Sequence, residues 1–165
     1  MKILYAPWRM AYIRKFCRKE ESGCFLCRAA REENDSENLV VYRGESCFVI
    51  LNRYPYNNGH LMIAPYRHVG NLLDLGESES SEIMRLLKIS IKALREEYKP
   101  DGFNVGVNLG RAAGAGLEDH IHFHVVPRWI GDTNFMPILS ETKVVPEALK
   151  ESWERLRKRF ENLKA

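Results

Sequence analysis

The sequence predicts an α+β fold in which helices pack on a five-stranded antiparallel sheet. Short runs rich in β-branched and aromatic residues are separated by turn residues, two longer segments carry apolar residues at helical spacing, and one apolar run alternates with histidines. Strands joined by such short turns are expected to be antiparallel. The 165 residues suffice for a single domain with a proper hydrophobic core.

Three of the expected strands follow one another closely. Residues 39–44 (LVVYRG) and 47–52 (CFVILN) are separated by a Gly-Glu-Ser turn, and residues 60–65 (HLMIAP) follow the turn sequence RYPYNNG. We expect Cys47, in the second run, to be a small core residue. The fourth strand is expected at residues 102–110 (GFNVGVNLG), and the histidine-rich segment is the fifth.

Two helices are expected. The first runs from about Glu77 to Tyr98, because GESESSE is typical of a capped helix start and Pro-Asp-Gly follows its end. The second runs from Pro146 to about Leu163. We interpret its basic run, RLRKRF, as the solvated face of a docked helix, because a net charge of +3 is too small to indicate a nucleic acid polymer as partner.

The segment DHIHFHVVPRW carries three histidines at alternate positions. In a strand, His120, His122 and His124 share one face and the hydrophobic residues between them face the core, so the histidines should line a surface or a cleft. The outer pair would lie about 13 Å apart, too far to share one metal ion. At least one imidazole is therefore available as acid, base or nucleophile. A polar face that is merely rich in histidine is the alternative, disfavoured because only His60 and His68 occur elsewhere.

A glycine-rich connection, NLGRAAGAGLED, precedes these histidines. Such a loop lets backbone N–H groups approach an anion closely, and Arg111 could add charge. The loop does not match the Walker pattern, which excludes a P-loop NTPase. A simple turn is the alternative, but the neighbouring histidines favour a phosphate site.

Cys24 and Cys27 form a Cys-x-x-Cys motif. Without a secretory signal, metal binding or redox chemistry is favoured over a disulfide framework. A redox site would be expected at the start of a helix after a strand, and no upstream segment has a strand pattern. Zinc needs two further ligands, and His68 with one end of the histidine triad would complete a Cys2His2 set.

Composition indicates an ordinary soluble globular protein, with 45% hydrophobic and 28% charged residues. The apolar runs are too short for a membrane span, and the start, MKILYAPWRMAYIRK, lacks the pattern of a secretory leader. The expected location is the cytoplasm.

Several segments together resemble a known family. HIHFHVV, NRYPYNNGHLMIAPYRH and NVGVNLGRAAGAG resemble the three sequence blocks of the histidine triad superfamily, and YAPWRMAYI, the Cys-x-x-Cys motif and PRWIGDTNFMP resemble its branch of diadenosine tetraphosphate phosphorylases and related hydrolases. The resemblance implies a single such domain, with an N-terminal metal-knuckle segment at 1–38, a core at 39–128 and a C-terminal extension at 129–165.

The resemblance also implies residue roles. His122 would attack the α-phosphorus of a dinucleoside polyphosphate and form a nucleotidyl-histidine, while His124 and His60 would surround the phosphate and the leaving group. No catalytic metal is then required. Substrate contacts would come from Asn52 at the ribose and from Asn108, Gly114, Ala115 and Gly116 at the phosphates, and the ligands of a structural zinc would be Cys24, Cys27, His68 and His120.

One departure from the family bears on the acceptor. Many triad hydrolases carry Gly-Gln-Ser or Gly-Gln-Thr before the histidines, whereas this chain has Gly-Ala-Gly-Leu from Gly114 and one extra residue. A smaller lining would leave room for orthophosphate, which favours phosphorolysis over hydrolysis. The alternatives are a nucleoside phosphoramidate hydrolase, a metal-dependent hydrolase with a His-x-His pair, or a non-catalytic nucleotide-binding protein.

A homodimer is the expected assembly. An open sheet has edges that must be paired or covered, and Met84 and Ile89 extend the apolar surface of the first helix beyond one narrow stripe. The resemblance implies two sheets meeting around a two-fold axis. Trp129 and Trp153 would then lie near the interface or the neighbouring active site, unless they pack the core of their own chain.

Overall fold

A five-stranded antiparallel sheet forms the centre of the structure, as the sequence predicts. The computed structural model describes residues 23–132 and 147–163. Sheet neighbours follow the order β1-β2-β3-β5-β4, so that β5 lies between β3 and β4. The strands are β1 (Val40–Arg43), β2 (Cys47–Leu51), β3 (Leu61–Pro65), β4 (Gly102–Val107) and β5 (Phe123–Arg128).

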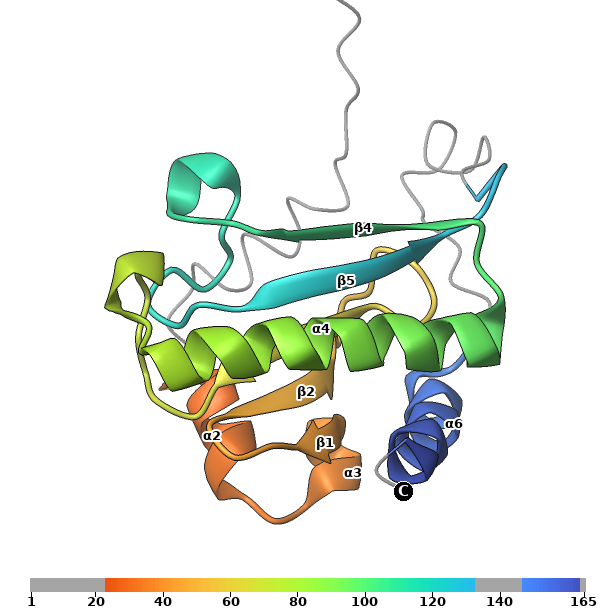
Figure 1. Ribbon diagram of the computed structural model, residues 1–165, viewed down its shortest axis with the longest axis horizontal. Coiled ribbons are helices and arrows are strands. Elements are labelled where there is room, and N and C mark those ends of the chain that lie inside the picture. Colours follow the sequence, from red (N-terminus) through yellow and green to blue (C-terminus); the bar gives the residue numbers. More distant parts are fainter. Residues whose placement is uncertain (1–22, 133–146, 164–165) are drawn as a thin grey trace, which may run out of the picture.

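Helices pack around this sheet (Figure 1). The longest, α4, lies lengthwise across one face, and α6 lies beside β1 and one end of α4. No helix in the described ranges is long and apolar enough to cross a membrane. The helices are α2 (Phe25–Arg31), α3 (Asp35–Asn38), α4 (Glu77–Tyr98) and α6 (Leu149–Asn162), and the 3₁₀ turns are η1 (Leu72–Asp74) and η2 (Arg111–Ala113).

The bounds of α4 agree with the sequence prediction at both ends. The Glu79 carboxylate accepts a hydrogen bond from the Gly76 N–H at 2.8 Å, which satisfies one of the amide donors at the helix start. At the other end, Lys99 adopts the left-handed conformation that terminates many helices. The second helix begins at Leu149, and the predicted start at Pro146 lies outside the described residues.

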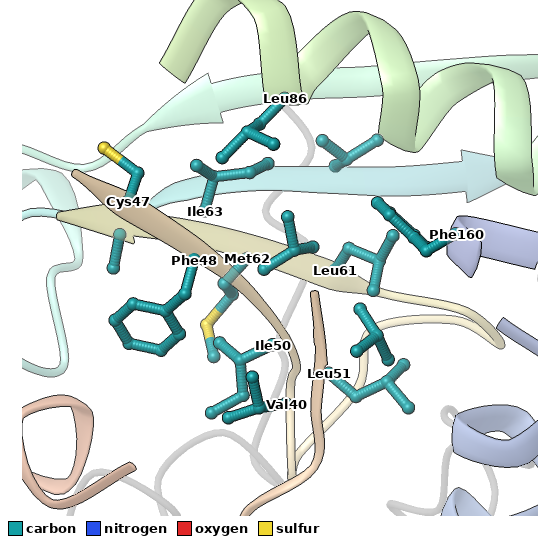
Figure 2. Close-up of a cluster of buried hydrophobic side chains, with 14 of the residues drawn as sticks. Val40, Cys47, Phe48, Ile50, Leu51, Leu61, Met62, Ile63, Leu86 and Phe160 are labelled. Carbon is teal, nitrogen blue, oxygen red and sulfur yellow. The ribbon is translucent and has the colours of Figure 1, made fainter. Parts of the chain in front are cut away.

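The core lies on both sides of the two central strands. Every residue of β2 and β3 is buried, including Cys47, as predicted. Cys47 and Ile63 lie on the side of α4, near Leu86, whereas Phe48 and Met62 point the other way (Figure 2). Burial on both faces explains why these strands have continuous apolar sequences instead of alternating ones.

The histidine-rich segment enters the sheet later than the sequence predicts. Strand β5 begins at Phe123, so His120 and His122 precede it. The Pro65 carbonyl, at the end of β3, accepts a hydrogen bond from the His120 ring at 2.9 Å, and the Ile121 N–H donates to Val69 beyond β3. The His120 side chain therefore binds a backbone carbonyl that could otherwise have extended the hydrogen-bond ladder between β3 and β5 to His120 and His122.

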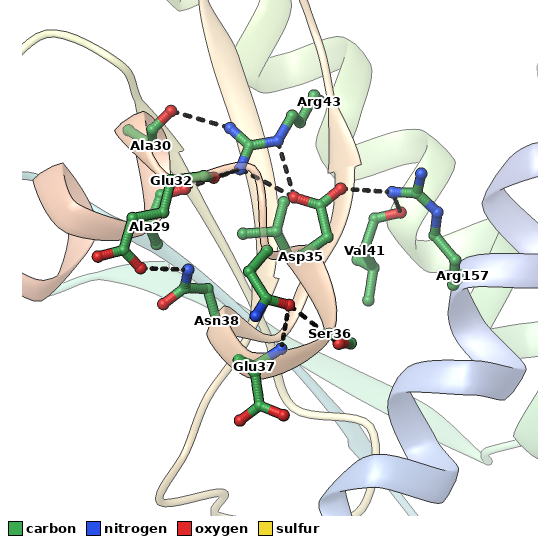
Figure 3. A network of polar contacts seen from close by, with 12 residues as sticks. Ala29, Ala30, Glu32, Asp35, Ser36, Glu37, Asn38, Val41, Arg43 and Arg157 are labelled. Carbon is green, nitrogen blue, oxygen red and sulfur yellow. Dashed lines mark hydrogen bonds and ion pairs between the residues drawn. The ribbon is translucent and has the colours of Figure 1, made fainter.

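Helix α6 is attached by its basic run. Arg155 and Arg159 pair with Glu97 on α4, and Arg157 pairs with Asp35 at the start of α3. The helix is docked and these arginine side chains remain 34–47% exposed, as we interpreted the run, but the same arginines also join the helix to two others. Figure 3 shows Arg157 and Arg43 on either side of the Asp35 carboxylate.

Trp153, also on α6, packs within its own chain. Its indole N–H donates to the Val40 carbonyl at 2.8 Å, and its side chain packs against the hydrophobic core. For this tryptophan, the structure supports the alternative in which it packs the core of its own chain.

Glu82 on α4 closes the turn between β1 and β2. Its buried carboxylate accepts hydrogen bonds from three successive backbone amides, at Glu45 (3.0 Å), Ser46 (2.5 Å) and Cys47 (3.0 Å), and it pairs with Arg85. Burial alone would raise the pKa of Glu82, but these donors outweigh it and the pKa is lowered. The carboxylate thus attaches the helix to the sheet in its ionised form.

We expect Glu82→Gln to destabilise the fold by about 2–4 kcal/mol, because an amide offers one acceptor oxygen and turns its own donors toward backbone N–H groups. The lowered pKa means that this stabilisation is present above the unfolded-state value of about 4.3 and is lost as the pH falls through the folded-state value. Urea unfolding should therefore show a difference from wild type near neutral pH that shrinks at about pH 3. Glu77→Gln, an exposed acid in the first turn of α4, is the control, and an equal loss in both variants would contradict the assignment.

Candidate active site

The sheet places His124 on the face opposite α4. Met62 pairs with His124 and Ile63 with Phe123, and cross-strand partners point to the same face. Because Ile63 lies on the side of α4, Phe123 does too, and His124 lies on the other face with Met62. This arrangement agrees with the prediction that the hydrophobic residues between the histidines face the core.

His122 is held as a neutral imidazole in one tautomer. Its Nδ1 lies 2.8 Å from the His120 carbonyl oxygen, and because a carbonyl can only accept, Nδ1 carries the proton. The lone pair is therefore on Nε2. Burial lowers the pKa of His122, while the bond to His120 opposes this shift only in part. The group is thus neutral near pH 7 and has the protonation state of a nucleophile.

His60 and His124 form a directed pair. The Tyr56 N–H (3.1 Å) and the Asn52 side-chain amide (3.4 Å) both donate to Nδ1 of His60, so the His60 proton is on Nε2. That Nε2–H donates to Nδ1 of His124 at 2.9 Å. His124 must then carry its own proton on Nε2. Burial of the ring is the main reason that the pKa of His60 lies well below its usual range, and the neighbouring His124 lowers it further, so His60 stays neutral.

The two outer histidines of the triad have different surroundings. The His122 and His124 rings meet edge to face with centroids 4.9 Å apart, so the two imidazoles are direct neighbours. His120 is completely buried and its ring turns to a separate cluster with Cys24, Cys27 and His68. The structure thereby brings His60, His122 and His124 together and separates His120 from them.

The cluster draws its four residues from three segments. Cys24 is the N-cap of α2 and Cys27 lies in its first turn, His68 follows β3, and His120 precedes β5. Their ligand atoms all lie within 4.8 Å of one another. Nδ1 of His120 lies 3.2 Å from Sγ of Cys24, 3.4 Å from Sγ of Cys27 and 3.3 Å from Nδ1 of His68.

These distances fit a tetrahedral metal site. Bond lengths of about 2.3 Å to sulfur and 2.0–2.1 Å to nitrogen imply sulfur–nitrogen edges of about 3.6 Å and nitrogen–nitrogen edges of about 3.4 Å. Nε2 of His120 donates to the Pro65 carbonyl, which leaves the lone pair on the nitrogen that faces the cluster. Burial raises the pKa of the Cys24 thiol to about 11, so a thiolate at this position needs a cation beside it.

Comparison with known proteins assigns the family. A family model described as HIT domain matches residues 32–129. The chain belongs to the HIT family. Among its relatives, a protein named AP-4-A phosphorylase from Mycobacterium tuberculosis is 42% identical over 154 residues, which cover 90% of this chain and 79% of the relative.

Other HIT proteins agree with this assignment. A bis(5'-adenosyl)-triphosphatase from Saccharomyces cerevisiae is 33% identical over 91 residues, covering 54% of this chain and 44% of that protein. The crystal structure of a Zn-bound histidine triad family protein from Mycobacterium smegmatis matches with a TM-score of 0.67 and 27% identity, over 86% of this chain and 96% of that one. The resemblance inferred from sequence is therefore confirmed at the level of the HIT family.

Of the predicted substrate residues of this HIT chain, one contacts a site histidine and the others lie in the connection between β4 and β5. Asn52 is buried beside His60, with its side-chain oxygen accepting from the Tyr54 N–H at 2.9 Å. Asn108 follows β4, directly after Val107, which pairs with Phe123. Gly114 has φ +89°, a left-handed conformation that glycine adopts without strain, and it ends the η2 turn. Ala115 and Gly116 follow it on the path to the triad.

Arg111 is engaged within the loop. Its backbone N–H and Nε both donate to the Glu118 carboxylate, at 3.2 and 2.8 Å, and Glu118 lies at the other end of the same loop. This ion pair closes the loop, whereas the sequence suggested that Arg111 could add positive charge to a phosphate site.

Sequence reasoning missed two features of the HIT site. The Tyr56 ring lies with its centroid 4.6 Å from that of His60 and 6.0 Å from that of His124. Asn57 is buried and bonds to Asp132, which follows β5. Both residues lie in the connection between β2 and β3, which the sequence predicts to be a turn. Only the folding of this connection around His60 shows that they belong to the site.

Proposed function

We propose that this chain cleaves dinucleoside polyphosphates, with diadenosine tetraphosphate as preferred substrate, and transfers the nucleotidyl group to orthophosphate. The observation that carries the proposal is His122, a buried neutral imidazole with its lone pair on Nε2, whose ring lies edge to face with that of His124. The identity of 42% to a relative named AP-4-A phosphorylase supports the choice of substrate and acceptor.

The first half of the proposed reaction uses the two neighbouring imidazoles. Nε2 of His122 attacks the α-phosphorus, a phosphorus–nitrogen bond forms, and the bond from phosphorus to the bridging oxygen breaks. The leaving nucleoside triphosphate departs as its anion, and its freed oxygen accepts a hydrogen bond from the Nε2–H of His124, which the bond from His60 directs. The product of this half is a nucleotidyl-histidine.

In the second half, an orthophosphate oxygen attacks the same phosphorus. The phosphorus–nitrogen bond breaks, ADP leaves and the neutral His122 is restored. The Gly114–Gly116 segment has no side chain larger than a methyl group, which supports an acceptor larger than water near the phosphates. Asn52 and Asn108 are proposed to orient the nucleotide, the first at the ribose and the second at the phosphates.

We further propose that Cys24, Cys27, His68 and His120 hold a structural zinc ion. Bound there, zinc would supply a closed cross-link between α2 and the segment before β5, with no open position for substrate. His120 connects the two sites through one residue, because its ring belongs to the cluster and its carbonyl sets the tautomer of His122. The reaction itself then needs only protein side chains.

Product analysis tests the proposed function. Incubation of the purified protein with diadenosine tetraphosphate should yield ADP and ATP only when phosphate is present. Formation of AMP and ATP without a requirement for phosphate would instead establish hydrolysis, the activity in the name of the yeast relative. Binding of the dinucleotide without any product would contradict the enzyme proposal and support a nucleotide-binding protein.

We propose that the protein is a homodimer that pairs its β4 edges. Within the described ranges, β4 pairs only with β5, and Val105 at its centre is 46% exposed. Light scattering should give about twice the chain mass of 19.2 kDa. Val105→Lys should shift the protein toward the monomer, whereas Leu73→Lys, in η1 outside the sheet, should not. A wild-type mass near that of one chain would contradict the dimer.

A further inference from the structure

Asp132, just beyond β5, gathers four hydrogen bonds on one carboxylate. Its side chain is only 7% exposed. Arg128 donates to both oxygens, from Nε at 2.6 Å and Nη2 at 2.9 Å, and the Trp129 N–H donates at 3.2 Å. The fourth donor is the Asn57 side-chain amide at 2.8 Å. Three donors come from residues near Asp132 in the sequence, and the fourth connects it to a loop 75 residues away.

That loop is the one that positions His60. It joins β2 to β3 without helix or strand, so its shape depends on hydrogen bonds from outside. The Asn57 carbonyl accepts from the His60 N–H at 3.2 Å, and the Tyr56 N–H donates to the His60 ring at 3.1 Å. Asn57 therefore supplies one of these two backbone groups and directly follows the residue that supplies the other, and its side chain reaches Asp132.

We infer that Asp132 is a positioning residue for the reaction, acting through Asn57 on the His60–His124 pair. The inference rests on the proposed function, in which the His124 N–H serves the leaving group. If Asp132 releases Asn57, the Tyr56 amide no longer stays directed at His60. The remaining donor to the His60 ring is the Asn52 side-chain amide at 3.4 Å, a longer bond that does not hold both rings in a single tautomer by itself. Placement errors of this kind reduce the rate strongly because a hydrogen bond to the leaving oxygen depends on distance and direction.

The test compares Asp132→Asn with Glu97→Gln. Both variants remove the charge of a carboxylate with low exposure that pairs with arginine, but Glu97 lies on α4 and holds α6. Nitrogen-15 NMR of the histidine rings in the substrate-free protein should show His60 and His124 protonated on Nε2 in wild type and in Glu97→Gln. In Asp132→Asn, both rings should show averaging between tautomers, while His122 stays protonated on Nδ1 because the His120 carbonyl is untouched.

Asn57→Ala is the second variant, because it removes the same connection, together with the longer bond from Asn57 to the Pro127 carbonyl at 3.3 Å, and leaves the pair of Asp132 with Arg128 intact. It should give the same averaging, and both variants should lower kcat by about ten- to a hundredfold with little change in KM. Unchanged His60 and His124 signals in Asn57→Ala would overturn the inference, whatever the stability of Asp132→Asn. Averaged signals in a protein that cleaves no dinucleotide would refute the proposed function and leave the positioning role standing.

Discussion

Replacing His122 by Ala is expected to abolish turnover while nucleotide binding persists. The other histidines of the site cannot substitute, because Nδ1 of His124 accepts from His60 and its Nε2 carries a proton. Loss of a nucleophile that defines the reaction path lowers kcat by more than about 10⁴-fold. Rapid-quench analysis should trap a nucleotidyl-protein in wild type and none in His122→Ala.

A matched control for His122→Ala is Tyr66→Phe, which removes a partly buried hydroxyl. That hydroxyl donates to the Gly44 carbonyl in the turn between β1 and β2, and neither of these strands neighbours β5. It should retain the wild-type rate. Turnover near the wild-type level in His122→Ala would refute the covalent mechanism. Loss of both turnover and dinucleotide binding would indicate a damaged fold instead, which circular dichroism of the same sample detects.

The pH dependence of the wild-type reaction follows from the burial of His122. Because the pKa of His122 is lowered, the neutral nucleophile predominates at neutral pH, and protonation removes it only as the pH falls below the usual histidine value of about 6.5. We therefore expect kcat/KM to be flat near neutrality and to fall on the acid side. A profile that instead rises as the pH falls below neutrality would contradict a neutral imidazole as nucleophile.

Loss of the metal cluster should have the largest effect on stability. Wild-type protein purified without chelator is expected to contain about one zinc per chain, and Cys24→Ser and Cys27→Ser should contain none. A ligand that binds only the folded state at a thousand times its Kd stabilises by about 4 kcal/mol, and structural zinc sites bind at least this well. Thermal unfolding of both variants should therefore begin far below that of wild type, and chelation should lower the wild-type transition toward theirs.

Cys47→Ala provides the control for the metal prediction. Cys47 is a completely buried core residue outside the cluster, so its replacement removes a thiol without removing a ligand. This variant should keep its zinc and lose only the modest stability of a small core truncation. Zinc absent from wild type, together with cysteine variants as stable as wild type, would show that the knuckle has no structural metal.

The secondary structure could largely be predicted because its causes are local. Apolar residues at a period near 3.6 placed α4 from Glu77 to Tyr98, and short β-branched runs placed β2 and β3 within one residue of their observed bounds. The alternation of His120, His122 and His124 with hydrophobic residues identified the segment that we propose carries the chemistry. These patterns depend on the geometry of one helix or strand, which neighbouring residues suffice to specify.

Only the tertiary structure decided how the site is oriented. The Pro65 carbonyl turns the His120 ring toward two cysteines about 95 residues away in the chain, and the Tyr56 amide sets which nitrogen of His60 carries the proton. Asp132 meets Asn57, and the arginines of α6 meet Asp35 and Glu97, through pairings that leave no periodic trace in the sequence. A hydrogen bond or an ion pair depends on the distance and direction between two atoms. The residue types in the sequence therefore show which side chains are able to bond, and the packing of the sheet and helices determines which of them do.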